Sequence, residues 1–278
     1  MAVSCPTNQV FCSENRALMQ SLPDGCCDMI YVDPPFCTGR AQFRKEEGHR
    51  FADQWPGGVA EYTEFLAERL VEMRRLLKET GTIFVHLDWH AVHYVKVAMD
   101  GIFGYESFLN EIIWSYRTGG VSKQWFGRKH DTILSYARAR GRHRFQVVRD
   151  GAFRTDGLNY DAEGRPYKST RSGRLYFHAS GPALTDVWEL PFLSTVSKER
   201  TGYPAQKPLS LLRRVVQSCT DAGDMVGDFF CGSGTTLVAA AELGRRYIGC
   251  DSERGAVEIA QRRLRECATL WDETSDES

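Results

Sequence analysis

The sequence predicts a doubly wound α/β fold with a mostly parallel central sheet and one inserted region. Three observations lead to this expectation. Short apolar segments alternate with longer segments in which apolar residues recur at helical spacing. Loops rich in proline or glycine directly follow two of the apolar segments. Periodicity is lost between Arg138 and Tyr203, where glycine, proline, arginine and aromatic residues dominate, as in an inserted module.

The composition is that of an ordinary globular protein, with 42% hydrophobic and 26% charged residues in a chain of 278. No apolar run approaches the ~18 residues needed to span a bilayer, and the first residues carry no export signal. The nine cysteines form no C-x-x-C pair, and His86, His90 and His93 have no further strong ligand partner in the pattern. We therefore expect a cytoplasmic protein with no membrane partner, no disulfide framework and no metal.

The N-terminal half supplies strands and helices in turn. Residues 8–12 are apolar enough for a strand, and residues 14–22 have helical spacing before a Pro-Asp-Gly turn. Residues 28–32 read as a buried strand, which must end at two consecutive prolines because proline stops both strands and helices. The pattern then predicts, in order, helix 61–78, strand 82–87, helix 91–103, strand 110–115 and strand 132–137.

Helix and strand patterns return after the inserted region. They predict, in order, helix 209–218, strand 225–229, helix 235–243, strand 247–251 and helix 256–267. Seven strands result, and their alternation with helices favours a parallel sheet with one antiparallel final strand. The acidic residues 269–278 form a tail that we expect to fray.

The glycine-rich loop at residues 228–236 follows a predicted strand and opens a predicted helix. Glycines let the backbone approach a ligand closely, and a helix N-terminus offers free N–H groups to a carboxylate. The next strand ends at Asp251, where an acid can accept hydrogen bonds from both hydroxyls of a ribose. No lysine follows Gly234 and Leu237 breaks the G-x-G-x-x-G spacing, which disfavours nucleoside triphosphates and NAD. A tight turn without a ligand stays open as an alternative.

The loop Asp33-Pro34-Pro35-Phe36 places a carboxylate, a rigid backbone carbonyl and an aromatic ring at the end of a strand. An aromatic amine is a poor nucleophile because its lone pair is delocalised into the ring. A carboxylate and a carbonyl that accept its two N–H bonds free that lone pair, and fixed acceptors need little reorganisation. Phe36 offers a flat face for a base swung out of a duplex. Alone, this tetrapeptide also fits a simple turn.

Charge is distributed unevenly along the chain. Residues 114–178 hold 14 Lys and Arg against 5 Asp and Glu, although the whole chain has a net charge of −1. A basic segment in an acidic body suits local neutralisation of phosphates, with a solvated basic loop as the alternative. The residues expected to contact DNA are Arg117, Lys123, Arg128 and Lys129.

Together the two loops resemble the permuted, beta-type group of DNA amino-methyltransferases, in which the catalytic motif precedes the cofactor motif. Residues 33–36 match the family's D-P-P-[YF] loop, and residues 228–235 match its D-x-F-x-G-x-G-T loop. Residues 8–15 resemble the segment that contacts the cofactor adenine, with Ser-Glu in place of Gly-Asp. Residues 203–208 resemble the P-T-Q-K-P segment near the methionine moiety, with alanine for threonine. The resemblance covers residues 8–138 and 201–267.

The resemblance implies a seven-stranded methyltransferase sheet and S-adenosylmethionine as cofactor. It assigns catalysis to Asp33, Pro34, Pro35 and Phe36. It assigns cofactor binding to Glu14, Asp33, Lys207, Asp228, Phe229, Phe230, Gly232, Ser233, Gly234, Thr235, Thr236 and Asp251.

The same resemblance implies a circularly permuted catalytic domain at residues 1–138 and 203–268, with a target-recognition insertion at 139–202. The expected partner is double-stranded DNA of a bacterium or phage, in restriction–modification or regulatory methylation, and a homodimer stays open because the family often dimerises. Aspartate at the first catalytic position favours adenine N6 as the target, with cytosine N4 second. An RNA methyltransferase and a non-catalytic DNA-binding relative are further alternatives.

Overall fold

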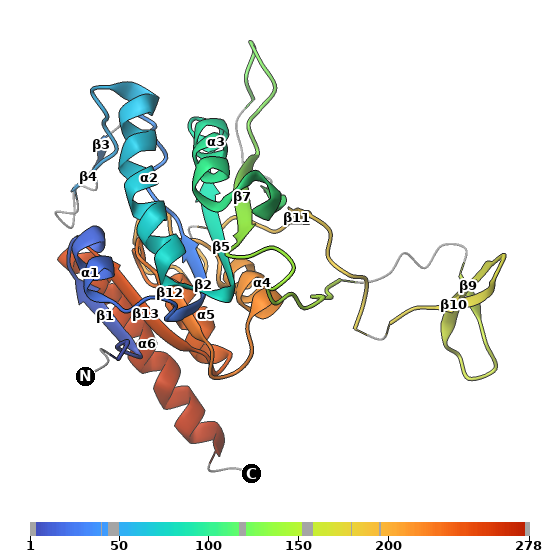
Figure 1. The fold of residues 1–278 in the computed structure, drawn as a ribbon. Coiled ribbons are helices and arrows are strands. Elements are labelled where there is room, and N and C mark those ends of the chain that lie inside the picture. The colour runs from blue at the N-terminus through green and yellow to red at the C-terminus, as the bar shows by residue number, and fades with distance from the viewer. Residues whose placement is uncertain are drawn as a thin grey trace.

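The computed structural model describes residues 4–39, 41–43, 50–116, 121–151, 158–178, 180–194 and 196–275. Within them an eight-stranded sheet in the order β1-β13-β12-β2-β5-β7-β6-β11 forms the centre of the molecule (Figure 1). Its strands are β1 (Gln9–Cys12), β2 (Cys27–Val32), β5 (Leu77–Leu87), β6 (Phe108–Ser115), β7 (His130–Ala137), β11 (Val187–Glu189), β12 (Met225–Asp228) and β13 (Arg246–Asp251).

The sheet is mostly parallel, which confirms the predicted fold class. β1, β13, β12, β2 and β5 run in one direction, and β7 is antiparallel to both of its neighbours, β5 and β6. The expected antiparallel strand is therefore β7, which lies inside the sheet. All seven predicted strands are present, and β11 is an eighth strand that pairs parallel to β6.

Helices cover both faces of the sheet, as a doubly wound fold requires. They are α1 (Asn15–Ser21), α2 (Gly58–Leu76), α3 (Val92–Phe103), α4 (Leu209–Cys219), α5 (Thr235–Glu242) and α6 (Arg254–Ser275). Ile30 and Val32 of β2 share a core cluster with buried residues of α1, α2 and α3. Met29 and Tyr31, which point to the opposite face, share a second cluster with residues of α4 and α5.

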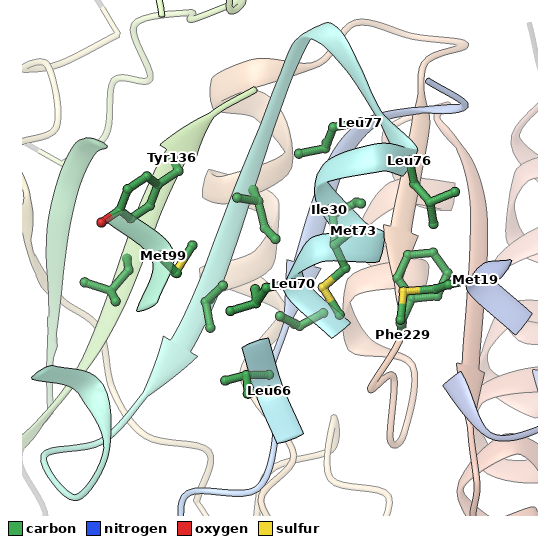
Figure 2. Close-up of a cluster of buried hydrophobic side chains, with 14 of the residues drawn as sticks. Met19, Ile30, Leu66, Leu70, Met73, Leu76, Leu77, Met99, Tyr136 and Phe229 are labelled. Atoms are coloured by element: carbon green, nitrogen blue, oxygen red, sulfur yellow. The ribbon is translucent and has the colours of Figure 1, made fainter. Parts of the chain in front are cut away.

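The first core cluster shows how helix α2 is held on the sheet (Figure 2). Leu66, Leu70 and Met73 recur at helical spacing, are fully buried and belong to the same cluster as Ile30 of β2. Burying each such side chain contributes about 1.5–3 kcal/mol. The helix ends at Leu76, two residues before the predicted boundary, because Leu77 already pairs with β2 as the first residue of β5.

Two small sheets and one short helix lie outside this centre. β8 (Asn159–Tyr160), β9 (Pro166–Thr170) and β10 (Gly173–Tyr176) form an antiparallel sheet that projects away from the main body (Figure 1). β3 (Ala41–Phe43) pairs with β4 (Arg50–Ala52), and the 3-10 helix η1 spans Tyr105–Ser107. The projecting sheet falls within the predicted recognition insertion. Trp188, at the C-terminal end of that insertion, is buried in a cluster with residues of β6 and α4.

None of the helices in the described part of the chain is both long and apolar enough to cross a bilayer.

Candidate active site

The order of the strands brings the two predicted loops together. β2 and β12 are parallel neighbours, so the loops that follow Val32 and Asp228 leave the same edge of the sheet. β13 lies beside β12 and ends at Asp251 on that edge. Ligands of open α/β sheets bind at the carboxyl ends of the strands. A cleft of about 1050 Å³, its open mouth included, occupies this position.

Most of the residues predicted for the site line this cleft. They are Asp33, Pro34, Pro35, Phe36, Lys207, Asp228, Phe230, Gly232, Ser233, Thr235, Thr236 and Asp251. Three others are absent from its walls. Phe229 is buried in the first core cluster (Figure 2), Gly234 packs against Ala260 of α6, and Glu14 caps α1 and accepts a hydrogen bond of 2.6 Å from Arg69.

Two glycines shape the loop after β12. Gly232 has φ +49°, and a Cβ there would lie 2.9 Å from the Tyr203 ring. Gly234, the N-cap of α5, has φ +76°, and a Cβ there would lie 2.6 Å from Cβ of Ala260. Both positions need glycine, because the left-handed conformation and the close contacts exclude a side chain. The Tyr203 ring thus packs directly against the backbone at Gly232.

An arginine that sequence analysis missed fixes this loop from below. Arg263 of α6 is buried and donates to the Ser233 carbonyl at 2.8 Å and to Oγ1 of Thr235 at 2.9 Å. A buried charge that is hydrogen-bonded in this way holds its partners in one geometry. Only the tertiary fold reveals it, because in sequence Arg263 is one of several basic residues on an amphipathic helix.

Five carboxylates from the described part of the chain line the cleft, those of Asp33, Asp53, Asp228, Asp251 and Glu253. Asp33 and Asp251 lie near Asp228, whose pKa is raised to about 7 by its burial first and then by these two neighbours. Burial also raises the pKa of Asp251, which accepts hydrogen bonds of 2.9 Å from the N–H groups of Gly232 and Glu253. A concentration of negative charge in a partly closed cleft favours a cationic ligand.

The Asp33-Pro34-Pro35-Phe36 loop is tied to the segment before α4. Lys207, buried at 7% exposure, donates to Oδ2 of Asp33 and lies 4.9 Å from the centre of the Phe36 ring. The other oxygen, Oδ1 of Asp33, is buried and has no hydrogen-bond partner among the described residues. A buried carboxylate oxygen without a partner is costly, so it marks a position where a ligand can donate.

Asp53 is a second residue that the sequence did not reveal. It is buried and accepts hydrogen bonds from the backbone N–H groups of Cys37 (2.8 Å) and Thr38 (2.7 Å), and from Nε1 of Trp55 (3.1 Å). These contacts anchor the chain directly after Phe36. No motif or periodicity singles out an aspartate in a polar loop.

Among the residues that the structure describes, no three His, Cys, Asp or Glu side chains gather in a way that could hold a metal. His86 is bonded to Asp131, Nδ1 of His90 lies 2.6 Å from Oδ2 of Asp88, and His93 is exposed on α3.

The residues predicted to contact DNA lie on the loop between β6 and β7, which we call the β6–β7 loop (residues 116–129). It leaves the sheet at the edge that carries the cleft, because Leu87, the last residue of β5, pairs with Thr132 near the start of β7. Lys123, Arg128 and Lys129 belong to it, whereas Arg117 lies outside the described residues. The guanidinium of Arg128 stacks on Trp89 at 3.6 Å.

The chain matches the family model of the N6/N4 DNA methylases over residues 27–262. The chain belongs to the N6/N4 DNA methylase family. This confirms the predicted family and the predicted enzyme class, a DNA methyltransferase that uses S-adenosylmethionine and modifies the amino group of adenine or cytosine.

Similar proteins agree with this family. The Type II methyltransferase M2.DpnII of Streptococcus pneumoniae is 30% identical, over 91% of this chain and 87% of that protein. The DNA adenine methyltransferase YhdJ of Escherichia coli (strain K12) is 26% identical, over 89% of this chain and 79% of that protein. Among solved structures, the cytosine-N4-specific PvuII DNA methyltransferase aligns with TM-score 0.64 at 15% identity, covering 97% of this chain and 93% of that one. The complex of M1.HpyAVI with SAM aligns with TM-score 0.58 at 18% identity, covering 92% of this chain and 98% of that one.

Proposed function

We propose that this N6/N4 DNA methylase transfers a methyl group from S-adenosylmethionine to N6 of an adenine that has been swung out of double-stranded DNA. The observation that carries the proposal is the buried Oδ1 of Asp33, which has no hydrogen-bond partner among the described residues and belongs to a residue that lines the cleft together with Phe36. This oxygen can accept a hydrogen bond from an amino group of a base that stacks on Phe36.

The catalytic loop prepares the amine for attack. Oδ1 of Asp33 and the Pro34 carbonyl accept its two N–H bonds, which concentrates the lone pair on the nitrogen. When bound, S-adenosylmethionine supplies a methyl group on a positively charged sulfur. Lys207 holds Oδ2 of Asp33 and so fixes the direction in which Oδ1 points. The same Oδ1 is placed to receive the proton that the methylated amine releases.

The cofactor is assigned to the half of the cleft formed by β12 and β13. Asp251 is placed to accept hydrogen bonds from ribose hydroxyls, and the start of α5 offers N–H groups to the carboxylate of the methionine moiety. Asp33, Asp228 and Asp251 together favour the cationic sulfonium and ammonium groups. Residues present in the cleft therefore fit S-adenosylmethionine.

DNA is assigned to the β6–β7 loop, with Lys123 and Arg128 as phosphate contacts. Two of its apolar side chains are almost fully exposed, Val121 at 96% and Phe126 at 99%. Basic and aromatic side chains beside one another suit a nucleic acid, because they contact phosphates and stacked bases respectively. The small projecting sheet of β8, β9 and β10 lies in the proposed recognition insertion, residues 139–202, and is a second surface for DNA.

Adenine is favoured over cytosine by the aspartate at the first position of the catalytic loop. The similarity to YhdJ, which is named as an adenine methyltransferase, supports the same choice. The setting we propose is the cytoplasm of a bacterium or phage-infected cell, where the protein acts on genomic DNA.

One experiment tests this function. The protein is incubated with labelled S-adenosylmethionine and unmethylated DNA or RNA, and the nucleosides are then identified by mass spectrometry. We expect N6-methyl-2′-deoxyadenosine from DNA alone, and none with Asp33→Ala, while that variant keeps its fold. N4-methyl-2′-deoxycytidine would show that the target base is cytosine, and methylated RNA nucleosides would show that the substrate is RNA. Full activity of Asp33→Ala would overturn the catalytic assignment.

A further inference from the structure

His86 lies at the carboxyl end of β5, next to the proposed base-binding ring. Its ring packs against Phe36 at 5.8 Å between centroids and 23° between planes, which is a stacked arrangement. His86 is fully buried and does not line the cleft, whereas Phe36 does. The histidine therefore supports the aromatic ring from the side that faces away from a ligand.

Both ring nitrogens of His86 have hydrogen-bond partners from other strands. Nδ1 lies 2.7 Å from the hydroxyl of Tyr31 on β2, and Nε2 lies 3.1 Å from Oδ2 of Asp131 on β7. The other oxygen of Asp131 accepts a hydrogen bond of 2.9 Å from Tyr116. Edge-on contact with Trp114, at 5.5 Å and 88°, confines the imidazole from another side.

Tyr31 and Asp131 hold the two ring nitrogens of His86 from two different strands. Burial raises the pKa of Tyr31 well above its ordinary value, so Tyr31 keeps its proton. Although burial opposes it, the hydrogen bond from His86 lowers the pKa of Asp131, so the carboxylate accepts. Nδ1 of His86 lies within hydrogen-bond distance of the Tyr31 hydroxyl and Nε2 within hydrogen-bond distance of the Asp131 carboxylate, so both ring nitrogens are held. An imidazole held at both nitrogens cannot rotate away from Phe36.

The network also reaches the proposed DNA surface. Tyr116 directly follows β6 and Asp131 is the second residue of β7, so both stand at the base of the β6–β7 loop. A contiguous set of contacts therefore runs from that loop through Asp131 and His86 to Phe36.

We propose that His86 is a positioning residue, which holds the Phe36 ring in the orientation required to stack the flipped base. This inference rests on the proposed function, because it assigns Phe36 to the target base. A role limited to stability would make His86 variants less stable without changing the rate of methyl transfer by the folded enzyme. A positioning role lowers kcat while the affinity for S-adenosylmethionine stays the same.

Three variants separate these roles in the full-length protein. His86→Leu removes both the flat face and the hydrogen bonds, and His86→Phe restores the flat face alone. Tyr31→Phe removes one hydroxyl and leaves Nδ1 of His86 without its hydrogen-bond partner. His93→Leu is the matched control, because His93 is exposed on α3 and lies outside the cleft and the network. Each is assayed for kcat on unmethylated DNA, for cofactor affinity by calorimetry and for the melting temperature.

We expect His86→Leu to lower kcat about 10- to 100-fold, since small misplacements of reacting groups have effects of this size. The kcat values of His86→Phe and Tyr31→Phe should lie between those of His86→Leu and the wild type. The cofactor affinity of all three variants should stay within about twofold of the wild type. His93→Leu should have the kcat of the wild type. Wild-type kcat in Tyr31→Phe and in either folded His86 variant would overturn the proposal. If the His86 variants do not fold, Tyr31→Phe decides by itself.

A crystal structure of the Tyr31→Phe or His86→Leu protein without DNA gives a readout that does not depend on the proposed function. A displaced or rotated Phe36 ring supports the positioning role, and a ring in its original plane contradicts it. Failure of the wild-type protein to methylate DNA would instead count against the proposed function, so the two failures are distinguishable.

Discussion

The ammonium group of Lys207 donates to Oδ2 of Asp33, whereas the buried Oδ1 has no hydrogen-bond partner in the part of the chain that the structure describes. The lysine comes from the segment before α4 and the aspartate from the end of β2, 174 residues apart in the chain. One side chain thus orients the proposed amine acceptor, and Lys207 acts by positioning Asp33.

Lys207→Met should reduce kcat about 10- to 100-fold, because Asp33 no longer has the hydrogen-bond donor that sets its orientation. Lys198→Met, which removes a charge from an exposed lysine of the same segment, should leave kcat unchanged. Single-turnover methylation of DNA with saturating cofactor measures both. Equal rates for the two variants would show that Asp33 is oriented without Lys207.

Asp251→Ala should weaken binding of S-adenosylmethionine by about 1–3 kcal/mol, because ribose hydroxyls lose their acceptor and Gly232 loses its partner. Asp251→Asn keeps one acceptor oxygen, so its affinity for S-adenosylmethionine should lie between those of the wild type and Asp251→Ala. Isothermal titration calorimetry with the cofactor alone gives the Kd of each protein. An unchanged Kd in Asp251→Ala would remove this residue from the cofactor site.

Gly232→Ala should lower the free energy of unfolding by about 1–2 kcal/mol, since alanine is strained at φ +49°. The new methyl group would also meet Tyr203 at 2.9 Å and shift it, so cofactor affinity should fall as well. Gly101→Ala is the control, because it lies in α3 with open space around it and no positive φ. Urea denaturation and calorimetry compare the two, and equal stability of both variants would contradict the expected strain.

Asp228 should make stability depend on pH, because its pKa is about 7 in the folded protein and about 3.9 in an unfolded chain. Between about pH 4 and pH 7 the folded state holds a proton that the unfolded state has released. The free energy of unfolding of the wild type, relative to Asp228→Asn, should therefore fall as the pH rises through this window and level off above about pH 7. Urea denaturation of both proteins from pH 5 to pH 8 measures the difference, and parallel curves would rule this titration out.

Replacing Lys123 and Arg128 together with alanine should weaken binding to any duplex and make the plot of log affinity against log salt shallower. The slope should change by roughly one unit for each phosphate that the variant no longer neutralises. Arg254 and Arg262, both exposed on α6, provide a matched pair far from the β6–β7 loop (Figure 1). Their double alanine variant should keep the wild-type slope. If the variant of Lys123 and Arg128 also keeps the wild-type slope, these two side chains do not contact phosphates and DNA binds to another surface.

The sequence by itself determined the fold class and the two loops of the site. Strand and helix patterns are local, since side chains alternate with period 2 in strands and 3.6 in helices, so each element could be read from its own residues. The loops at Asp33 and Gly232 could be read for the same reason, because proline and glycine impose backbone conformations locally. The extra strand β11 could not be predicted from the sequence, since its three residues form a strand only where the folded chain places them beside β6.

The tertiary structure alone decided what supports these loops. Arg263, Asp53 and His86 each hold residues that lie 15 or more positions away in the chain, and no local pattern marks these contacts. It also decided that Phe229 faces the core and that Glu14 is engaged by Arg69, although both belong to segments with family-like motifs. A motif specifies the backbone of its own loop, whereas hydrogen bonds and ion pairs form between whichever side chains the folded sheet brings within about 3 Å.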